Sequence, residues 1–371
     1  MIEIEFLNNR SLEAFEVHEA FMQIAQQVRT ESVCEMFDKT VNDLVCKMEP
    51  SMLFGKKLKT VTYSIGKMNE IIDRGDAYKM VKIAECLQVQ GINMLGKHVA
   101  EHPNLKAVLI AGPSSSGKTT FSKKLQKALE ANGMVAQCIS LDDYYVDREK
   151  TPLDDNGEYD YESLYAIDIE IFQRHLNLLL QGQEVELPRY DFKTGLSVMS
   201  GKHIKLEDNT VLIIEGIHAL NPLLTDRLPG DKLFRIYISG LTVAKNDDGT
   251  YFPTTDNRLI RRMVRDAQFR NTSASSTLAR WPSVRRGENK WVVPFQANAD
   301  VNFCTAFQYE LALLKHQAVP LLSQVEPTDP NYIEAQRLKW VVEHFHDISV
   351  DMLPSDSLLR EFIGGSTYDN H

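Results

Sequence analysis

One short stretch constrains the fold of this chain more than any other feature: the segment VLIAGPSSSGKTTF at residues 108–121. Its apolar run stops at Gly112, and Gly117, Lys118 and Thr119 begin five residues later. A helical pattern of apolar residues comes next. This order of strand, tight turn and helix matches G-x-x-x-x-G-K-[ST], a loop that holds phosphates.

The residue types in this loop explain how it would bind an anion. Small side chains let backbone N–H groups turn inward, and the helix N-terminus adds its positive dipole end. We expect Lys118 to reach the outer phosphates and the Thr119 hydroxyl to bind Mg²⁺. A serine-rich surface turn could match by chance, but the flanking strand and helix favour a nucleoside triphosphate site. Its expected residues are Gly112, Ser114, Ser115, Ser116, Gly117, Lys118, Thr119 and Thr120.

The composition narrows the class of protein. A length of 371 residues suggests two domains, or one large domain with an extension. The net charge of −10 argues against nucleic acid as the main ligand. No apolar run approaches the roughly 18 residues of a membrane span. The five cysteines are scattered without a C-x-x-C pair, which favours the reducing cytoplasm.

Residues 1–100 are expected to form a mainly helical N-terminal domain of unassigned role. Apolar residues recur at helical spacing over 12–48 and again over 66–101. The first stripe either faces the core or forms a seam between copies, so a homo-oligomer stays open. His98 and His102 could form half of a metal site, but without further ligands nearby we favour two solvent-facing imidazoles.

Strands and helices alternate over 101–371, which is typical of a parallel sheet. The expected strands are 106–111, 135–140, 210–215, 232–238 and 299–304. The expected helices are 118–132, 167–181, 256–270, 305–315, 330–346 and 355–363. We therefore predict an α/β P-loop fold of the nucleoside and nucleotide kinase type, with a parallel sheet flanked by helices.

Acidic residues at strand ends favour a kinase over a GTPase. The N-K-x-D guanine reader is missing, because no Asp follows Asn289-Lys290 at the right place. Asp142 and Asp143 follow strand 135–140, at the sheet edge where ligands bind, and one of them can accept a hydroxyl proton. The alternative is an Asp pair that caps a turn. Glu215 ends strand 210–215 beside the phosphate loop and suits Mg²⁺ or its waters, although it could be a solvated strand end.

Arginines are concentrated in the segment DNRLIRRMVRDAQFR. They are Arg258, Arg261, Arg262, Arg265 and Arg270. The first, third and fourth share one helix face. Surface helices also carry arginines as solvated charge, but this density in an acidic protein favours a lid, at about 256–290, that covers the transferred phosphoryl group and excludes water.

Taken together, the motifs resemble the uridine kinase/phosphoribulokinase family of P-loop kinases, with the uridine kinases nearer. The resembling segments, over about 106–304, are GPSSSGKT, LDDYY, YDYES, LPRYDF, IIEGIH, DNRLIRRMVRD and ADV. A longer match, to about residue 366, is similar to a nucleoside (uridine) kinase-like subgroup that often carries a threonyl-tRNA synthetase-related N-terminal part. Residues 1–55 resemble no family that we can name.

The resemblance implies roles for individual residues. Asp142 takes the position of the catalytic base, and Tyr145 that of an aromatic residue at the acceptor site. Glu162 falls where uridine kinases have an Asp that grips the ribose hydroxyls, and Tyr190 matches the wall of the nucleoside pocket. Three residues match arginines that contact phosphates or the acceptor sugar: Arg262, Arg265 and Arg270.

Two positions depart from the uridine kinase pattern. Where those enzymes read the pyrimidine with a His and an Arg, this chain has Gly195 and Thr272. Neither supplies a charged donor, and Gly195 is expected to leave open space. A site that loses hydrogen-bonding side chains loses discrimination, so we predict poor selectivity for uridine.

The sequence therefore predicts an ATP-dependent, Mg²⁺-using kinase that transfers the γ-phosphoryl group to a small-molecule hydroxyl, first of all the 5′-hydroxyl of a nucleoside. A phosphoribulokinase-like acceptor, such as a sugar phosphate or another metabolite, is the enzyme alternative. A non-catalytic nucleotide-binding regulator is the alternative from another class, with WPSVRRGE and the N-terminal helices as partner surfaces.

Overall fold

The computed structural model describes residues 55, 62–207, 209–225 and 228–368. The expected helix over 12–48, and any seam that it forms between copies, lies outside these residues. Within the described ranges, no helix combines the length and the apolar character that crossing a membrane requires.

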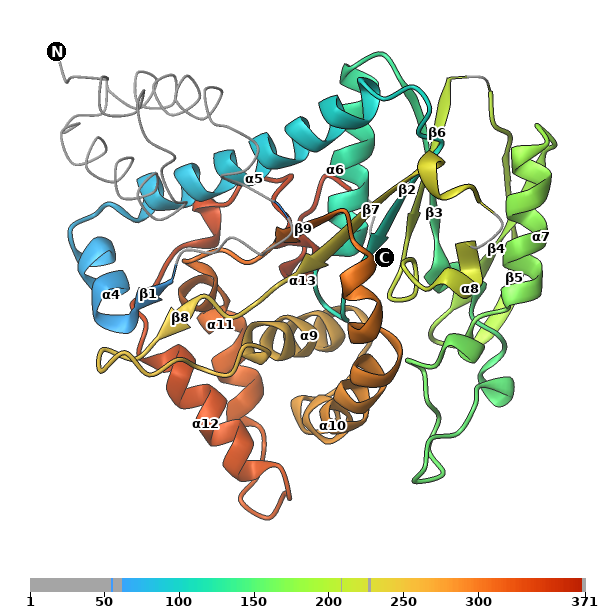
Figure 1. The fold of residues 1–371 in the computed structure, drawn as a ribbon. Coiled ribbons are helices and arrows are strands. Elements are labelled where there is room, and N and C mark those ends of the chain that lie inside the picture. The colour runs from blue at the N-terminus through green and yellow to red at the C-terminus, as the bar shows by residue number, and fades with distance from the viewer. Residues whose placement is uncertain (1–54, 56–61, 208, 226–227, 369–371) are drawn as a thin grey trace, which may run out of the picture.

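A parallel five-stranded sheet forms the centre of the molecule, with strand order β3-β6-β2-β7-β9 (Figure 1). Its strands are β2 (Ala107–Ala111), β3 (Val135–Ser140), β6 (Thr210–Glu215), β7 (Leu233–Ser239) and β9 (Val301–Cys304). All five expected strands are confirmed to within two residues at either end. The predicted α/β parallel fold is therefore correct.

Strand β2 shows why these apolar runs become central strands. Val108 and Ile110 belong to one hydrophobic cluster, whereas Ala107, Leu109 and Ala111 belong to a second cluster on the other face. Side chains alternate between the two faces of a strand, and both faces here are covered, so the run is apolar throughout. The sheet therefore separates two cores.

Helices cover both faces of the sheet (Figure 1). The first cluster includes residues of α4, α5, α6, α9, α11, α12 and α13, and the second is completed by α7. Their bounds are α4 (Ile65–Asp73), α5 (Ala77–Ala100), α6 (Lys118–Ala131), α7 (Ile169–Leu180), α9 (Asp256–Phe269), α11 (Glu310–Ser323), α12 (Tyr332–Glu343) and α13 (Arg360–Ile363).

Three expected helices differ from the observed ones. The single helix expected over 66–101 is two helices, because the chain turns at Gly75, which has a φ of +78°. Residues 305–309 form a turn at the phosphate loop, so α11 begins later than expected, at Glu310. The last helix is a short α13, since Pro354 and the turn at Ser357 precede it.

The prediction missed two larger elements. One is the helix α10 (Ala274–Trp291), which contains Pro282. The other is the antiparallel hairpin of β4 (Val185–Asp191) and β5 (Leu196–Ile204). Strand β5 buries only its last residue, Ile204, so it carries no apolar alternation that the sequence could reveal.

Candidate active site

The phosphate loop joins β2 to α6 and needs glycine at two places. A Cβ on Gly112 would lie 2.3 Å from the carbonyl oxygen of Ile238. Gly117 has a φ of +86°, and a Cβ there would lie 2.5 Å from Leu358. Because L-residues disfavour positive φ and neither position has room for a side chain, both glycines are required by the loop's shape.

Polar groups converge inside this loop. The Lys118 amino group donates to the carbonyl oxygens of Gly112 at 3.0 Å and Pro113 at 3.2 Å. The Ser115 and Ser116 hydroxyls are buried and have no protein partner among the described residues. Buried polar atoms without partners are costly, so the loop fits an anion that would satisfy these hydroxyls.

The carboxyl ends of neighbouring strands bring Glu215 beside the loop. Strand register places Ser140 opposite Glu215, and the Ser140 hydroxyl donates to its carboxylate at 2.8 Å. The Thr119 hydroxyl donates to the same carboxylate oxygen at 3.3 Å. The expected neighbourhood of Thr119 and Glu215 is thus present, and hydroxyl and carboxylate oxygens suit Mg²⁺.

Three carboxylates crowd this edge of the sheet, and burial changes their acidity. Burial, and then the charge of Asp142, raises the pKa of Glu215 to about 7. The same two causes raise the pKa of Asp143 to about 6. Asp142 lies in a short turn, and its own backbone N–H donates to the Ser140 hydroxyl at 3.3 Å. The chain therefore holds Asp142 beside Glu215. Such a group of close carboxylates favours a bound cation.

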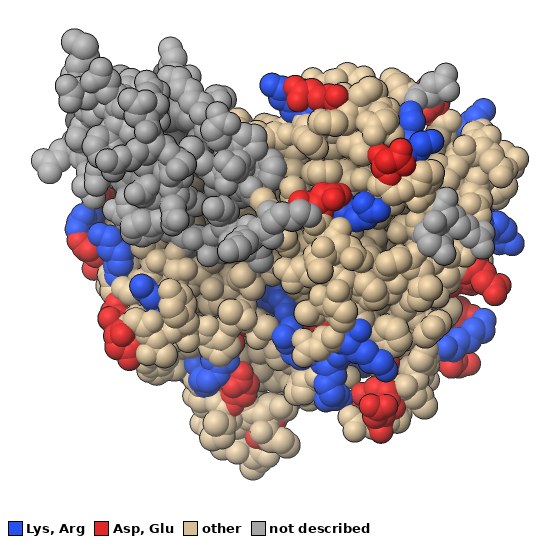
Figure 2. All heavy atoms as spheres, in the orientation of Figure 1, with Lys and Arg blue, Asp and Glu red and all other residues tan. Residues whose placement is uncertain are grey.

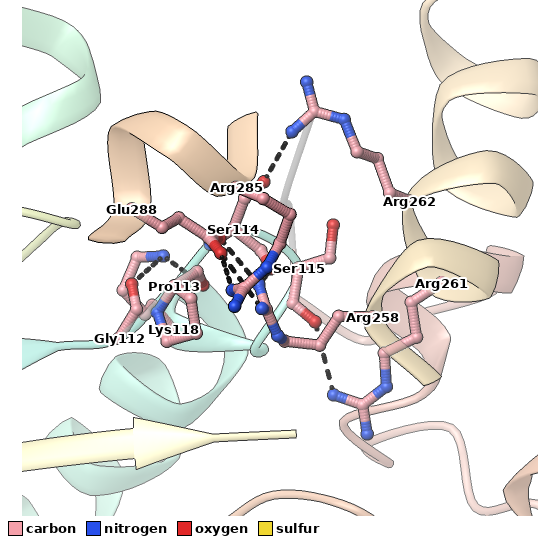
Figure 3. Close-up of polar contacts among 10 residues, drawn as sticks. All are labelled: Gly112, Pro113, Ser114, Ser115, Lys118, Arg258, Arg261, Arg262, Arg285 and Glu288. Atoms are coloured by element: carbon pink, nitrogen blue, oxygen red, sulfur yellow. Dashed lines mark hydrogen bonds and ion pairs between the residues drawn. The ribbon is translucent and has the colours of Figure 1, made fainter. Parts of the chain in front are cut away.

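The arginines of α9 do not share one environment, and the lid expected at about 256–290 stays a prediction. Arg258 pairs with Glu288 at 2.6 Å (Figure 3), and Arg261 pairs with Glu310. All four side chains are buried. Helix α9 also buries Leu259, Ile260, Met263 and Val264 in the core. Two of its five arginines therefore fasten a packed helix, because a buried charge must be paired.

Asp266 gathers the remaining three arginines of the segment. It contacts Arg262 at 3.5 Å, Arg265 at 2.7 Å and Arg270 at 3.6 Å. Arg262 also donates to the Ser114 hydroxyl of the phosphate loop at 2.8 Å (Figure 3). Mutual repulsion, with Arg265 first, and burial lower the pKa of Arg270 to about 10. This excess of positive charge beside the loop suits an anionic ligand.

Glu288 is a site residue that the sequence analysis missed. Its carboxylate accepts the Ser114 backbone N–H at 2.9 Å and also binds Arg285 at 2.5 Å. It belongs to the segment WPSVRRGE, which was considered as a partner surface. Its arginine Arg285 and its glutamate instead face the phosphate loop (Figure 3). The spacing of Arg285 and Glu288 on one helix face was the available signal.

Positive charge also appears on the surface near α10. Figure 2 shows lysine and arginine side chains grouped in this region, although the whole chain is acidic. Arg280, Arg286 and Lys290 are exposed members of that helix. Such a local basic surface attracts anionic ligands over the distance set by salt screening.

Aromatic rings line the expected acceptor side. The Tyr145 and Tyr190 rings lie 5.5 Å apart, and the Phe192 ring lies 5.0 Å from that of Tyr190. The Arg270 guanidinium lies 4.7 Å from the centre of the Phe192 ring. The structure therefore brings Arg270, which the resemblance matched to arginines that contact phosphates or the acceptor sugar, close to the expected acceptor residues Tyr145 and Tyr190.

Glu162 reaches the same region from the segment before α7. A Cβ on Gly287 of α10 would lie 2.4 Å from the Glu162 Cβ, so the two segments are in close contact. Burial raises the pKa of Glu162 to about 7, although the Arg262 charge opposes the shift. Glu162 thus lies within electrostatic reach of Arg262, between the phosphate loop and the acceptor side.

The open space expected at Gly195 is absent. A Cβ on Gly195 would lie 2.7 Å from the Arg148 guanidinium, and Arg148 also donates to the Phe192 carbonyl oxygen at 2.8 Å. A cationic side chain from another segment therefore fills this place. At the second altered position, the half-buried Thr272 donates its hydroxyl to the Arg270 carbonyl oxygen at 3.2 Å.

Two histidines quoted from the sequence, His98 and His218, lie in different surroundings. The His98 ring packs against Phe234 at 4.9 Å, so it is not fully exposed as expected, and no metal-binding cluster of three ligands forms within the described residues. His218, in the segment after β6, was quoted in the motif IIEGIH without a role. It is buried, and burial lowers its pKa to about 4, so it is neutral.

Sequence comparisons with known proteins agree on one family. The family model of the phosphoribulokinase/uridine kinase family matches residues 107–240. A uridine kinase from Staphylococcus haemolyticus is 30% identical over 200 residues, which cover 53% of this chain and 86% of that protein. A uridine kinase from Halalkalibacterium halodurans is 32% identical over 193 residues, which cover 52% and 82%. The solved structure of D-glycerate 3-kinase from Cryptococcus neoformans is 12% identical, covers 59% of this chain and 94% of its own, and gives a TM-score of 0.40.

Proposed function

This chain belongs to the phosphoribulokinase/uridine kinase family, and from that premise we propose that it transfers the γ-phosphoryl group of ATP to a hydroxyl of a small molecule. The 5′-hydroxyl of a nucleoside is the first acceptor that we propose. The observation that carries the proposal is the meeting of the phosphate loop, Asp142 and Glu215 at one edge of the sheet.

The phosphate loop residues would bind the triphosphate. Lys118 would exchange its two carbonyl partners for phosphate oxygens, and Arg262 already reaches the loop through Ser114. Arg265 and Arg270 would add positive charge from the same cluster. Positioned cations stabilise the charge on a phosphoryl group in transfer, which is the main contribution of such sites.

Thr119 and Glu215 would hold Mg²⁺, with the Thr119 hydroxyl and the Glu215 carboxylate as its protein oxygens. The ion, when bound, neutralises charge on the phosphate oxygens. A bound cation also favours the ionised form of Glu215, whose pKa is raised when only protein charges surround it. Metal binding would therefore release a proton near neutral pH.

Asp142 would act as the base for the acceptor. The acceptor oxygen forms a bond to the γ-phosphorus while the bond from that phosphorus to the bridging oxygen of ADP breaks. The hydroxyl proton passes to Asp142. Burial, and then the charge of Asp142, raises the pKa of Asp143, the other member of the pair, to about 6.

We propose that the acceptor side of the site does not select uridine strongly over other acceptors. Tyr145 and Tyr190 would provide an aromatic wall, and Glu162 would grip sugar hydroxyls. The Arg148 side chain fills the place beside Gly195, so a cationic group lies there although Gly195 itself supplies none. A phosphorylated sugar or another anionic metabolite therefore remains the second proposal, since Arg148 and Arg270 flank Phe192.

The remaining parts of the chain carry broader proposals. We propose that residues 1–100 are a distinct N-terminal part, related in the wider subgroup to threonyl-tRNA synthetase, and that 101–371 form the kinase unit with α9 and α10 beside its site. In the described part, α5 and α6 share one hydrophobic cluster, so the two parts would be closely joined. We place the protein in the cytoplasm, where ATP is abundant.

A panel of acceptors tests the proposed function. The panel holds uridine, cytidine, inosine, guanosine and a pentose phosphate, and ADP release is measured with the wild type and with Glu162→Ala. We expect acceptor-dependent ADP release, with selectivity for uridine over inosine below about a hundredfold. Glu162→Ala should lower kcat/KM for every sugar-containing acceptor to a similar degree, because the hydroxyl grip does not involve the base.

Two outcomes would contradict these proposals. Strong selectivity for uridine would mean that another residue reads the base. ATP binding without turnover on any acceptor would favour the nucleotide-binding regulator. The variant Asp142→Asn distinguishes a kinase from a regulator. A kinase would lose turnover in this variant, whereas a regulator would keep its partner binding.

A further inference from the structure

The last part of the chain returns to the phosphate loop. Leu358, Leu359 and Phe362 are buried in the core, with at most 1% of each residue exposed. Asp356 pairs with Lys124 of α6 at 3.1 Å. Leu358 lies so close to Gly117 that any side chain at that glycine would collide with it. The backbone of this segment is therefore held firmly against the loop.

Glu361 on α13 uses this position to reach a backbone donor of the loop. Its carboxylate accepts the Thr120 backbone N–H at 3.0 Å, and it is 7% exposed. Its charge also contributes to the raised pKa of Glu215, which places it within the same site. The contact joins residues separated by 241 positions, so only the tertiary structure reveals it.

The Thr120 donor belongs to the set that an anion would use. Helix α6 begins at Lys118, and its first backbone hydrogen bond runs from the Phe121 N–H to the Gly117 carbonyl oxygen at 3.0 Å. The N–H of Thr120 is thus the last donor at the helix N-terminus that the helix does not use itself. In a loop of this kind, these donors cradle the phosphates of the nucleotide.

We propose that Glu361 is a built-in competitor of the triphosphate, whose carboxylate occupies the Thr120 donor until a nucleotide displaces it. The inference rests on the proposed ATP site. The segment itself stays in place, since its apolar residues are core residues. Only the Glu361 side chain turns away, by rotation about its own bonds.

This competition would lower the apparent affinity for nucleotide. When a binding-competent state is only a fraction of the population, the apparent dissociation constant rises by the inverse of that fraction. A carboxylate on a backbone N–H is a charge-assisted hydrogen bond, and the same charge would repel a nearby phosphate. One such bond corresponds to roughly a tenfold effect on binding.

The test measures binding alone, so it does not depend on the acceptor. Titrations of ATP and of inorganic tripolyphosphate are compared for the wild type, Glu361→Gln and Glu361→Ala. Asp351→Asn is the matched control, because it removes one negative charge from the exposed part of the same C-terminal region. We expect Kd for both ligands to fall roughly tenfold in the two Glu361 variants and to stay unchanged in the control.

Other outcomes overturn the proposal. A Kd for ATP that is unchanged or higher in Glu361→Gln, with wild-type thermal stability, would show that Glu361 does not compete. Weaker binding of ATP in the Glu361 variants, with unchanged binding of tripolyphosphate, would show that Glu361 contacts the nucleoside and not the phosphates. An equal gain in Asp351→Asn would reduce the effect to general charge.

A crystal structure of the wild-type chain with ADP decides the question even if the variants fold poorly. Release of Glu361 from the Thr120 N–H in the complex supports displacement, and a retained bond refutes it. Failure of the wild type to bind ATP at all would instead refute the proposed function on which the inference rests.

Discussion

Arg261 and Glu310 form a buried two-pronged ion pair between α9 and α11, in which Arg261 Nη2 donates to Glu310 Oε2 at 2.7 Å. Neither side chain exposes any surface. The next residue, Arg262, points elsewhere and reaches the Ser114 hydroxyl of the phosphate loop. Two successive arginines thus have different roles: Arg261 joins two helices, and Arg262 contacts the phosphate loop.

This difference predicts opposite effects of two neighbouring substitutions. Arg261→Ala should lower the free energy of unfolding by about 3–5 kcal/mol, because Glu310 would be left buried without its partner. Arg262→Ala should leave the unfolding midpoint in urea close to that of the wild type and lower kcat by roughly a hundredfold or more, as for a cation on the phosphoryl group. Equal loss of stability in both variants would contradict the assignment.

Removal of the proposed base should affect turnover and spare nucleotide binding. We expect Asp142→Asn to lower kcat by roughly a hundredfold or more, the contribution of one positioned acid–base group. Its Kd for ATP should change little, since the base acts on the acceptor. Asp143→Asn is the control. An inactive Asp143→Asn beside an active Asp142→Asn would move the role by one residue, and full activity in both would refute the mechanism.

Loss of the loop lysine should weaken ATP binding itself. In Lys118→Ala, the loop loses the one side-chain cation that it positions directly, so ATP binding by calorimetry should become weak or undetectable. Lys127→Ala, at an exposed position of the same helix, should bind ATP as the wild type does. Normal binding by Lys118→Ala would mean that the loop does not hold a triphosphate.

Glu215 should make stability depend on pH in a definite direction. Its pKa is raised to about 7 in the folded chain, above its ordinary value of 4.5, so between these values the folded state holds the proton more firmly than the unfolded state does. The contribution of Glu215 to stability is therefore greatest below pH 4.5 and is lost as the pH rises through 7. Glu215→Gln cannot ionise and should escape this loss.

Urea unfolding at pH 5 and pH 8 checks this expectation. The stability of Glu215→Gln relative to the wild type should be higher at pH 8 than at pH 5. Its Mg²⁺-dependent activity should be lower than that of the wild type. Glu130→Gln, at an exposed position of α6, is the control for the removal of one carboxylate. The opposite result, a relative stability of Glu215→Gln that is lower at pH 8 than at pH 5, would contradict this expectation. It would show that interactions of the ionised Glu215 carboxylate stabilise the folded state by more than its burial destabilises it.

The pattern along the chain predicted the sheet and the ends of its strands. Apolar runs such as 210–215 need no other context, because a strand covered on both faces is apolar throughout. The phosphate loop was readable as well, since its glycines, lysine and threonine lie next to one another in sequence. The hairpin strand β5 was not, because its exposed residues carry no period that burial would impose.

What the sequence alone determined is local chemistry: the phosphate loop at 112–120, the acidic strand ends at Asp142 and Glu215, and the cluster of arginines. The tertiary structure decided which charges neutralise one another, since Glu288, Glu310 and Glu361 approach from segments distant in the chain. It also decided that Arg148 fills the place beside Gly195. The physical reason is that an arginine's role depends on its nearest carboxylate and its burial, and both are set by packing between elements that sequence spacing does not relate.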